Sequence, residues 1–195
     1  LLVQLSAAGF EVIPEGDPLI GGRTDILIIN TCGFILDAKE ESIEAILEGV
    51  EAKEEGSVEK LYVMGCLSER YRKELAEEIP EVDGYFGKFD HDKLLEQLNK
   101  KYNNLLCNER VLTTPNHYAY LKIAEGCNRA CSYCAIPIIT GPYKSRTIEE
   151  IEDEVKYLVS TGVKEFQVIA QDLSFYGLDN YKRLALPDLI KRLSD

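Results

Sequence analysis

The chain alternates short apolar runs with segments of helical periodicity, and this alternation restricts the folds open to it. The run DILIINT at residues 25–31 is rich in β-branched residues, as expected of a strand buried on both faces of a parallel sheet. The run KLYVMG at residues 60–65 has the same character. Between them, Asp37 and Glu40 are spaced as a capping box that would begin a helix. The apolar face predicted for this helix comprises Ile43, Ile46, Leu47 and Val50.

The α/β pattern continues to about residue 102. A helix predicted over residues 68–78 ends before Pro80, because proline disfavours helical geometry in the residue that precedes it. A short strand at residues 83–86 and a leucine-rich helix follow. Residues 103–116 lack clear periodicity and carry Asn, Thr and Pro, so we interpret them as a linker. The sequence thus predicts an N-terminal α/β domain over residues 1–102.

A second α/β pattern begins after this linker. A strand predicted at residues 118–124 leads into a cysteine-rich loop, and Thr147 with Glu150 forms another capping box. A strand at residues 165–170 and a final amphipathic helix follow. A complete eightfold parallel barrel needs about 250 residues, so residues 117–195 could form only the first two βα units of a barrel. The apolar face of the helix after the capping box comprises Ile148, Ile151, Val155 and Leu158.

Composition narrows the classes of partner. The net charge is -12 and no block of Lys and Arg stands out, so we do not expect nucleic acid as a partner of this part of the protein. A protein or a small molecule is the expected partner. No apolar run approaches the roughly 18 residues of a membrane span and no secretory leader is present, so we expect a cytoplasmic protein without membrane contact. Six cysteines in a reducing compartment are better interpreted as metal ligands than as disulfides.

Three of these cysteines lie in the stretch GCNRACSYC, which places Cys127, Cys131 and Cys134 in the loop after a predicted strand. Structural zinc needs four closed ligands, and the nearest extra candidate is His117. Simple ferredoxin clusters need a fourth cysteine. A four-iron cluster held by three thiolates leaves one iron without a protein ligand, and that iron can bind a substrate. The spacing therefore favours an open iron-sulfur site, with zinc and metal-free thiols as alternatives.

Two other cysteines directly follow the two apolar runs of the first half. If the strands are parallel neighbours, Cys32 and Cys66 emerge at the same carboxyl edge of the sheet, where ligands bind. Ordinary buried cysteines are the alternative interpretation. Cys107, in the linker, is interpreted as a bystander.

Four polar residues of the second half are further candidates. Gln171 and Asp172 follow the second strand, where a cofactor contact and a loop cap are equally compatible with the sequence. Lys144 and Arg146 could hold a carboxylate near the cysteine loop, although solvated loop charges are the simpler interpretation.

The motif CxxxCxxC, with an aromatic residue, Tyr133, before its last cysteine, resembles that of radical S-adenosylmethionine (SAM) enzymes. The resemblance implies that SAM and a four-iron cluster bind at Cys127, Cys131 and Cys134. Further segments are similar to the methylthiotransferases of this class, and most similar to the RimO type. These segments are NTCGFI (30–35), ES (41–42), GCL (65–67), IPEVD (79–83), HYAYLKIAEGCN (117–128) and AQDLSFYG (170–177).

This resemblance implies an N-terminal parallel-sheet methylthiotransferase domain followed by the first βα units of a radical SAM barrel, a partial TIM-like barrel. It implies two four-iron clusters, with Cys32 and Cys66 as two of the three ligands of the auxiliary one. The third ligand is expected before Leu1, so we expect a fragment that is inactive alone. No catalytic side chain is assigned.

The activity implied is methylthiolation of an aspartate of the small-subunit ribosomal protein numbered twelve, with electrons from a separate donor. A tRNA methylthiotransferase acting on a modified adenosine is the alternative within the class. A non-catalytic iron-sulfur or zinc module is the alternative from another class.

Overall fold

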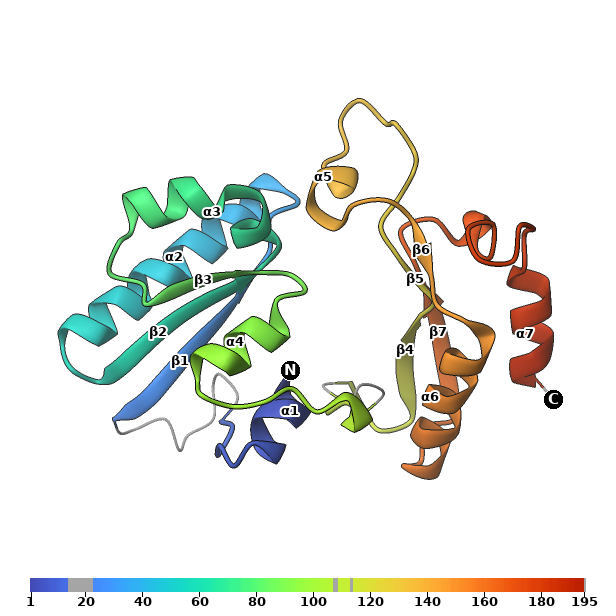
Figure 1. Ribbon diagram of the computed structural model, residues 1–195, viewed down its shortest axis with the longest axis horizontal. Helices are drawn as coiled ribbons and strands as arrows, with labels where there is room; N and C mark the ends of the chain where they lie inside the picture. Colours follow the sequence, from blue (N-terminus) through green and yellow to red (C-terminus); the bar gives the residue numbers. More distant parts are fainter. Residues whose placement is uncertain (14–22, 107–108, 113, 195) are drawn as a thin grey trace. The chain divides into compact units, whose positions relative to one another are not determined.

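The structure is a computed structural model that describes residues 1–13, 23–106, 109–112 and 114–194. The chain forms two compact units (Figure 1). One unit is Leu5–Tyr102, and the other combines Leu1–Gln4 with Asn103–Asp195. Among the described residues, no helix is both long and apolar enough to cross a membrane.

The first unit is built on a parallel sheet of strand order β1-β2-β3, which confirms the predicted fold class. The central strand β2 contributes Leu61 and Val63 to a core that Ile46 and Leu67 enter from the two neighbouring helices. The helices α2 and α3 therefore cover the same face of the sheet. The elements of this half of the chain are α1 (Leu2–Ala7), β1 (Thr24–Thr31), α2 (Leu36–Glu54), β2 (Val58–Gly65), α3 (Cys66–Glu78), β3 (Gly84–Gly87) and α4 (His91–Gln97).

The buried face of α2 differs from the predicted one. Its buried residues are Ser42, Ile46 and Gly49, whereas Ile43 and Leu47 are 37% and 51% exposed. A side chain at position 49 would come within 3.0 Å of two side chains of the sheet, so the small residues allow close approach of the helix. Apolar periodicity alone could not identify a face that small residues define.

The ends of the first helices test three further predictions. The capping box predicted at Asp37 does not form, because Asp37 lies inside α2, whose N-cap is Ile35, two residues earlier, with no side-chain cap. The helix α3 begins at Cys66, two residues before the predicted start. Its end is as predicted, with Ile79 as the C-cap immediately before Pro80.

The second unit contains the parallel pair β4–β7, and the predicted capping box of Thr147 with Glu150 is confirmed at the start of α6. The antiparallel pair β5–β6, of two residues each, was not predicted. The buried residues Leu121 and Ile151 share a core with Leu189 of the last helix. The elements are η1 (Asn104–Leu106), β4 (Tyr118–Lys122), β5 (Ala124–Glu125), α5 (Ile136–Thr140), β6 (Lys144–Ser145), α6 (Ile148–Ser160), β7 (Glu165–Ile169), η2 (Leu173–Phe175) and α7 (Leu186–Ser194).

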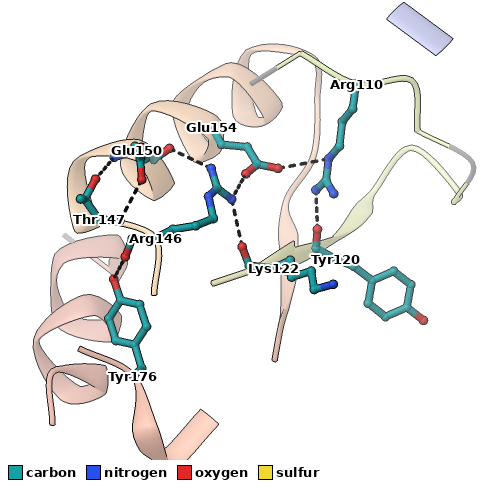
Figure 2. Close-up of polar contacts among 8 residues, drawn as sticks. All are labelled: Arg110, Tyr120, Lys122, Arg146, Thr147, Glu150, Glu154 and Tyr176. Carbon is teal, nitrogen blue, oxygen red and sulfur yellow. Dashed lines mark hydrogen bonds and ion pairs between the residues drawn. The ribbon is translucent and has the colours of Figure 1, made fainter. Parts of the chain in front are cut away.

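The outer edge of β4 is occupied by side chains. Backbone groups of a strand alternate between its two edges, and Ile123 N donates to Ile169 O on the β7 side, so the even-numbered carbonyls of β4 point the other way. Each of these carbonyls accepts a hydrogen bond from a side chain, which protects the edge against pairing with another strand. The pairs are Thr114 Oγ1 with Tyr118 O at 2.8 Å, Arg110 Nη2 with Tyr120 O, and Arg146 Nη1 with Lys122 O at 2.9 Å. Figure 2 shows the two arginine pairs.

A buried carboxylate holds two of these donors in place. Figure 2 shows Glu154, which is 6% exposed, between the guanidinium groups of Arg110 and Arg146. Arg110 Nε lies 3.2 Å from Glu154 Oε1, and Arg146 Nη1 pairs with Glu154 Oε2. The hydroxyl of Tyr176 also donates to Arg146 O at 3.0 Å. Arg146 is therefore neither a solvated loop charge nor a ligand holder beside the cysteine loop, and both predicted roles are wrong.

Candidate functional site

The cysteine loop begins after β5 at Gly126, where any side chain would clash with the backbone. Gly126 has a φ of +74°, and an added Cβ would lie 2.2 Å from Pro142 O. The next part of the loop is tied to the same returning segment, since Asn128 Oδ1 accepts a hydrogen bond from Tyr143 N at 2.9 Å. The segment around residues 141–143 thus fixes the start of the loop.

The structure brings the four predicted residues of this loop to one pocket of about 160 Å³. Cys127 is buried, Cys134 is half-buried and Cys131 is exposed. Tyr133 lies at the pocket with 90% of its surface exposed. The complete lining is Cys127, Arg129, Cys131, Tyr133, Cys134, Ile136, Gln171 and Asp172.

Gln171 and Asp172, which follow β7 and Ala170, line the same pocket. Hydrogen bonds from Ser174 and from Arg129 hold the pKa of the Asp172 carboxyl below its usual value. Asp172 also caps η2 through its bond to Ser174 N, so the predicted loop cap is present. Gln171 Oε1 is buried and has no hydrogen-bond partner among the described residues. It is an acceptor available to a ligand with a polar hydrogen.

The donor set of this pocket fits an iron-sulfur cluster with an open iron. Three thiols from one loop face one cavity, and an unpartnered acceptor lies beside them. Within the part of the chain that the structure describes, no three His, Cys, Asp or Glu side chains are gathered closely enough to hold a metal ion. For a cluster to bind, the sulfur atoms of Cys127, Cys131 and Cys134 would therefore have to move closer together.

Other predicted ligands lie elsewhere. His117 precedes β4, whereas the cysteine loop follows β5, so this histidine is at the opposite end of the strand and does not line the pocket. Cys107 lies outside the described residues. Arg129 and Ile136 line the pocket but were not predicted as site residues. The only signal for Arg129 was its place between the first two cysteines of the motif.

Cys32 and Cys66 stand at matched places in the first unit. Thr31 and Gly65 are partners in the parallel register, and each cysteine directly follows one of them. An added Cβ at Gly33 would lie 2.7 Å from Cys66 O, so the main chains touch after the strands end. Cys32 is exposed and Cys66 is half-buried. Both cysteines thus lie at the carboxyl edge of the sheet.

Two family models match separate parts of the chain. Residues 121–192 match the model of the radical SAM superfamily, and residues 1–87 match that of "Uncharacterized protein family UPF0004". The second half of the chain, with its cysteine loop after a parallel strand, is therefore similar to the radical SAM superfamily. SAM and an iron-sulfur cluster are the cofactors that this superfamily implies.

Curated relatives match the chain over its full length. Over its full length the chain is 63% identical to ribosomal protein uS12 methylthiotransferase RimO of Bacteroides fragilis. It is 57% identical to the RimO of Chlorobaculum tepidum and 55% identical to that of Porphyromonas gingivalis. The predicted resemblance to RimO-type methylthiotransferases is confirmed. The chain spans 44% of the length of each of these relatives.

Proposed function

We propose that the protein of which this chain is part transfers a methylthio group to an aspartate of ribosomal protein uS12 by radical SAM chemistry. The observation that carries the proposal is the meeting of Cys127, Cys131 and Cys134 at one pocket, in a chain similar over its whole length to enzymes named for this activity. Such a substrate places the enzyme in the cytoplasm. The net charge of -12 suits a basic protein partner better than tRNA.

In this proposal the three thiolates of the loop hold a four-iron cluster and leave one iron open for SAM. When bound, the cluster supplies the electron that breaks the sulfonium of SAM. The chain's own residues fix the start of the loop and line the pocket. Gly126 and Asn128 hold this start, Cys127 is buried and lines the pocket, and Gln171 offers an acceptor.

Cys32 and Cys66 would supply two ligands of an auxiliary four-iron cluster, with a third from another part of the protein. Their support is the parallel register that places both at one sheet edge. We further propose a first domain over residues 1–102, a linker over 103–116 and a barrel portion over 117–195. The division of the two compact units between Tyr102 and Asn103 supports this proposal, although Leu1–Gln4 groups with the second unit.

The test is an assay of the purified full-length enzyme with SAM, a chemical reductant standing in for the electron donor, and uS12. The wild type should form 5'-deoxyadenosine and add about 46 Da to uS12, the mass gained when CH3S replaces one hydrogen. A variant with Cys127, Cys131 and Cys134 all changed to Ala should do neither. If this variant still forms 5'-deoxyadenosine, the site assignment is wrong.

A further inference from the structure

We propose that Arg129 and Asp172 form a clamp that fastens the cysteine loop to the segment after β7, which makes Arg129 a positioning residue for the cluster. The effect of the clamp on a cluster rests on the proposed function, whereas the contacts between Arg129 and Asp172 do not. Arg129 lies between the first two cysteines of the motif, and Asp172 lies 43 residues further along the chain.

One guanidinium makes three contacts with the same short segment. Arg129 Nε donates to Asp172 Oδ2 at 2.7 Å, and Arg129 Nη2 donates to Ser174 Oγ at 3.3 Å. The guanidinium carbon lies 5.4 Å from the ring centroid of Phe175, within range of a cation–π contact. A planar guanidinium that pairs with a carboxylate and stacks on a ring is held in one orientation, whereas the ammonium group of a lysine is not.

The receiving carboxylate is also held by contacts that do not involve Arg129. Asp172 Oδ1 accepts from Ser174 N at 3.0 Å and from Ser174 Oγ at 2.6 Å, which leaves Oδ2 for the guanidinium. The Asp172 side chain is only 15% exposed, whereas that of Arg129 is 57% exposed. Asp172 is thus the more restrained partner of the clamp, and Arg129, on the cysteine loop, is the more exposed partner.

A second chain of contacts closes around the same place. The ring of Phe175 packs edge-on against Tyr143 with centroids 5.7 Å apart. Tyr143 N in turn donates to Asn128 Oδ1, on the residue beside Arg129. The loop is therefore held at Asn128 and Arg129 together, and beyond this point Cys131 and Tyr133 are exposed.

The clamp acts on a cluster ligand through the backbone. Arg129 N lies 3.4 Å from Cys127 Sγ and donates to it. Hydrogen bonds to ligating sulfur and nearby positive charge raise the reduction potential of an iron-sulfur cluster. Releasing the side chain of Arg129 should therefore loosen this amide, lower the potential of the cluster and speed its loss.

The experiment uses the full-length enzyme with Cys32 and Cys66 changed to Ala, so that the loop supplies the remaining cluster. The variants are Arg129→Gln, Asp172→Asn, the double variant and Arg129→Lys. The matched control is Arg183→Gln, because Arg183 is also an exposed arginine paired with an aspartate, Asp188, away from the pocket. The readouts are the rate of iron loss to a chelator, the midpoint potential, and amide exchange of residues 128–134 in the iron-free protein.

Arg129→Gln and Asp172→Asn should each speed iron loss about tenfold, as expected for the loss of a group that orients a metal ligand. The double variant should be no worse than either single one, because both remove the same contact. The potential should fall in Arg129→Gln and recover partly in Arg129→Lys. Amide exchange of the loop should rise in both single variants and stay unchanged in the control.

The clamp is overturned if Arg129→Gln and Asp172→Asn match the control in amide exchange, or if their effects on iron loss add. Amide exchange is measured without iron, so it judges the clamp even if the parent takes up no iron. A parent that takes up no iron would overturn the proposed function instead. The two failures are therefore distinguishable.

Discussion

Thr31 and Gly65 face each other at the last register position of the β1–β2 pair, and Thr31 Oγ1 donates across the pair to Met64 O at 2.7 Å. The close approach at this point depends on glycine. Gly65 has a φ of +111°, and an added Cβ would lie 2.5 Å from Thr31 O. A side chain at position 65 would push the two strands apart and destabilise the pair. The strand pair that precedes Cys32 and Cys66 therefore requires glycine at this position.

Gly65→Ala should reduce the free energy of unfolding by about 3 kcal/mol, through backbone strain and a main-chain clash. The matched control is Gly56→Ala, at a φ of +78° with nothing within 4 Å of the added Cβ. Only the backbone cost of about 1 kcal/mol applies there. Urea unfolding of the two variants measures the difference, and equal losses would show that the contact with Thr31 does not matter.

Glu154→Gln should destabilise the protein by about 3 kcal/mol, because it leaves two arginines beside a buried group that has lost its charge. The matched control lies on the same helix. Glu152 pairs with Lys156 and Arg192, whose side chains are 66% and 61% exposed. Glu152→Gln should cost less than about 1 kcal/mol. Thermal or urea unfolding compares them, and a similar loss in both would contradict the importance of burial.

Asp90 predicts an acid dependence of stability. Burial raises the pKa of its carboxyl, but hydrogen bonds from Lys93, Gly87 N and Arg72 outweigh burial and lower the pKa to about 2. The pKa is lower in the folded than in the unfolded state, so the stabilisation is complete above the unfolded value of 3.8 and is lost as the pH falls toward 2.

Because the arginine and lysine partners of Asp90 are 43% and 60% exposed, the contribution should be about 1 kcal/mol. The measurement is the free energy of unfolding of the wild type and of Asp90→Asn at pH 6 and then at successively lower pH. The difference between the two proteins should shrink between about pH 4 and pH 2. A difference independent of pH would contradict the role of this carboxylate.

Amide exchange should be slower in β2 than in β7. The strand β2 lies between β1 and β3, and five consecutive residues from Leu61 to Gly65 are buried. In the described part of the chain, β7 pairs with β4 alone, and its alternate residues are exposed. Exchange followed by mass spectrometry or NMR compares the strands. Equal protection would show that the second unit is as stable as the first.

The sequence predicted most elements because local signals and tertiary packing agree there. The apolar runs became β1 and β2, and the capping box of Thr147 with Glu150 formed as expected. The carboxyl-edge position of Cys32 and Cys66 followed from parallel pairing. Each of these features depends on short spacings that a sequence displays directly.

The features that the sequence did not predict depend on contacts between distant residues or on small residues without an apolar side chain. The buried face of α2 is set by Ser42 and Gly49, which carry no apolar signal. The pairing of Arg146 with Glu154 in a buried site looks, in sequence, like ordinary loop and helix charges. Arg129 meets Asp172 across 43 residues, and nothing in the local sequence connects them.

The most direct test of the central claim is the mass of uS12 in a strain of the source organism that lacks the gene for this protein. Ribosomal protein and digested tRNA from the strain are compared by mass spectrometry, with and without a plasmid carrying the full-length gene. We expect uS12 to lose about 46 Da in the deletion strain and to regain it with the plasmid, while tRNA stays unchanged. Unaltered uS12 together with loss of a methylthioadenosine from tRNA would contradict the account.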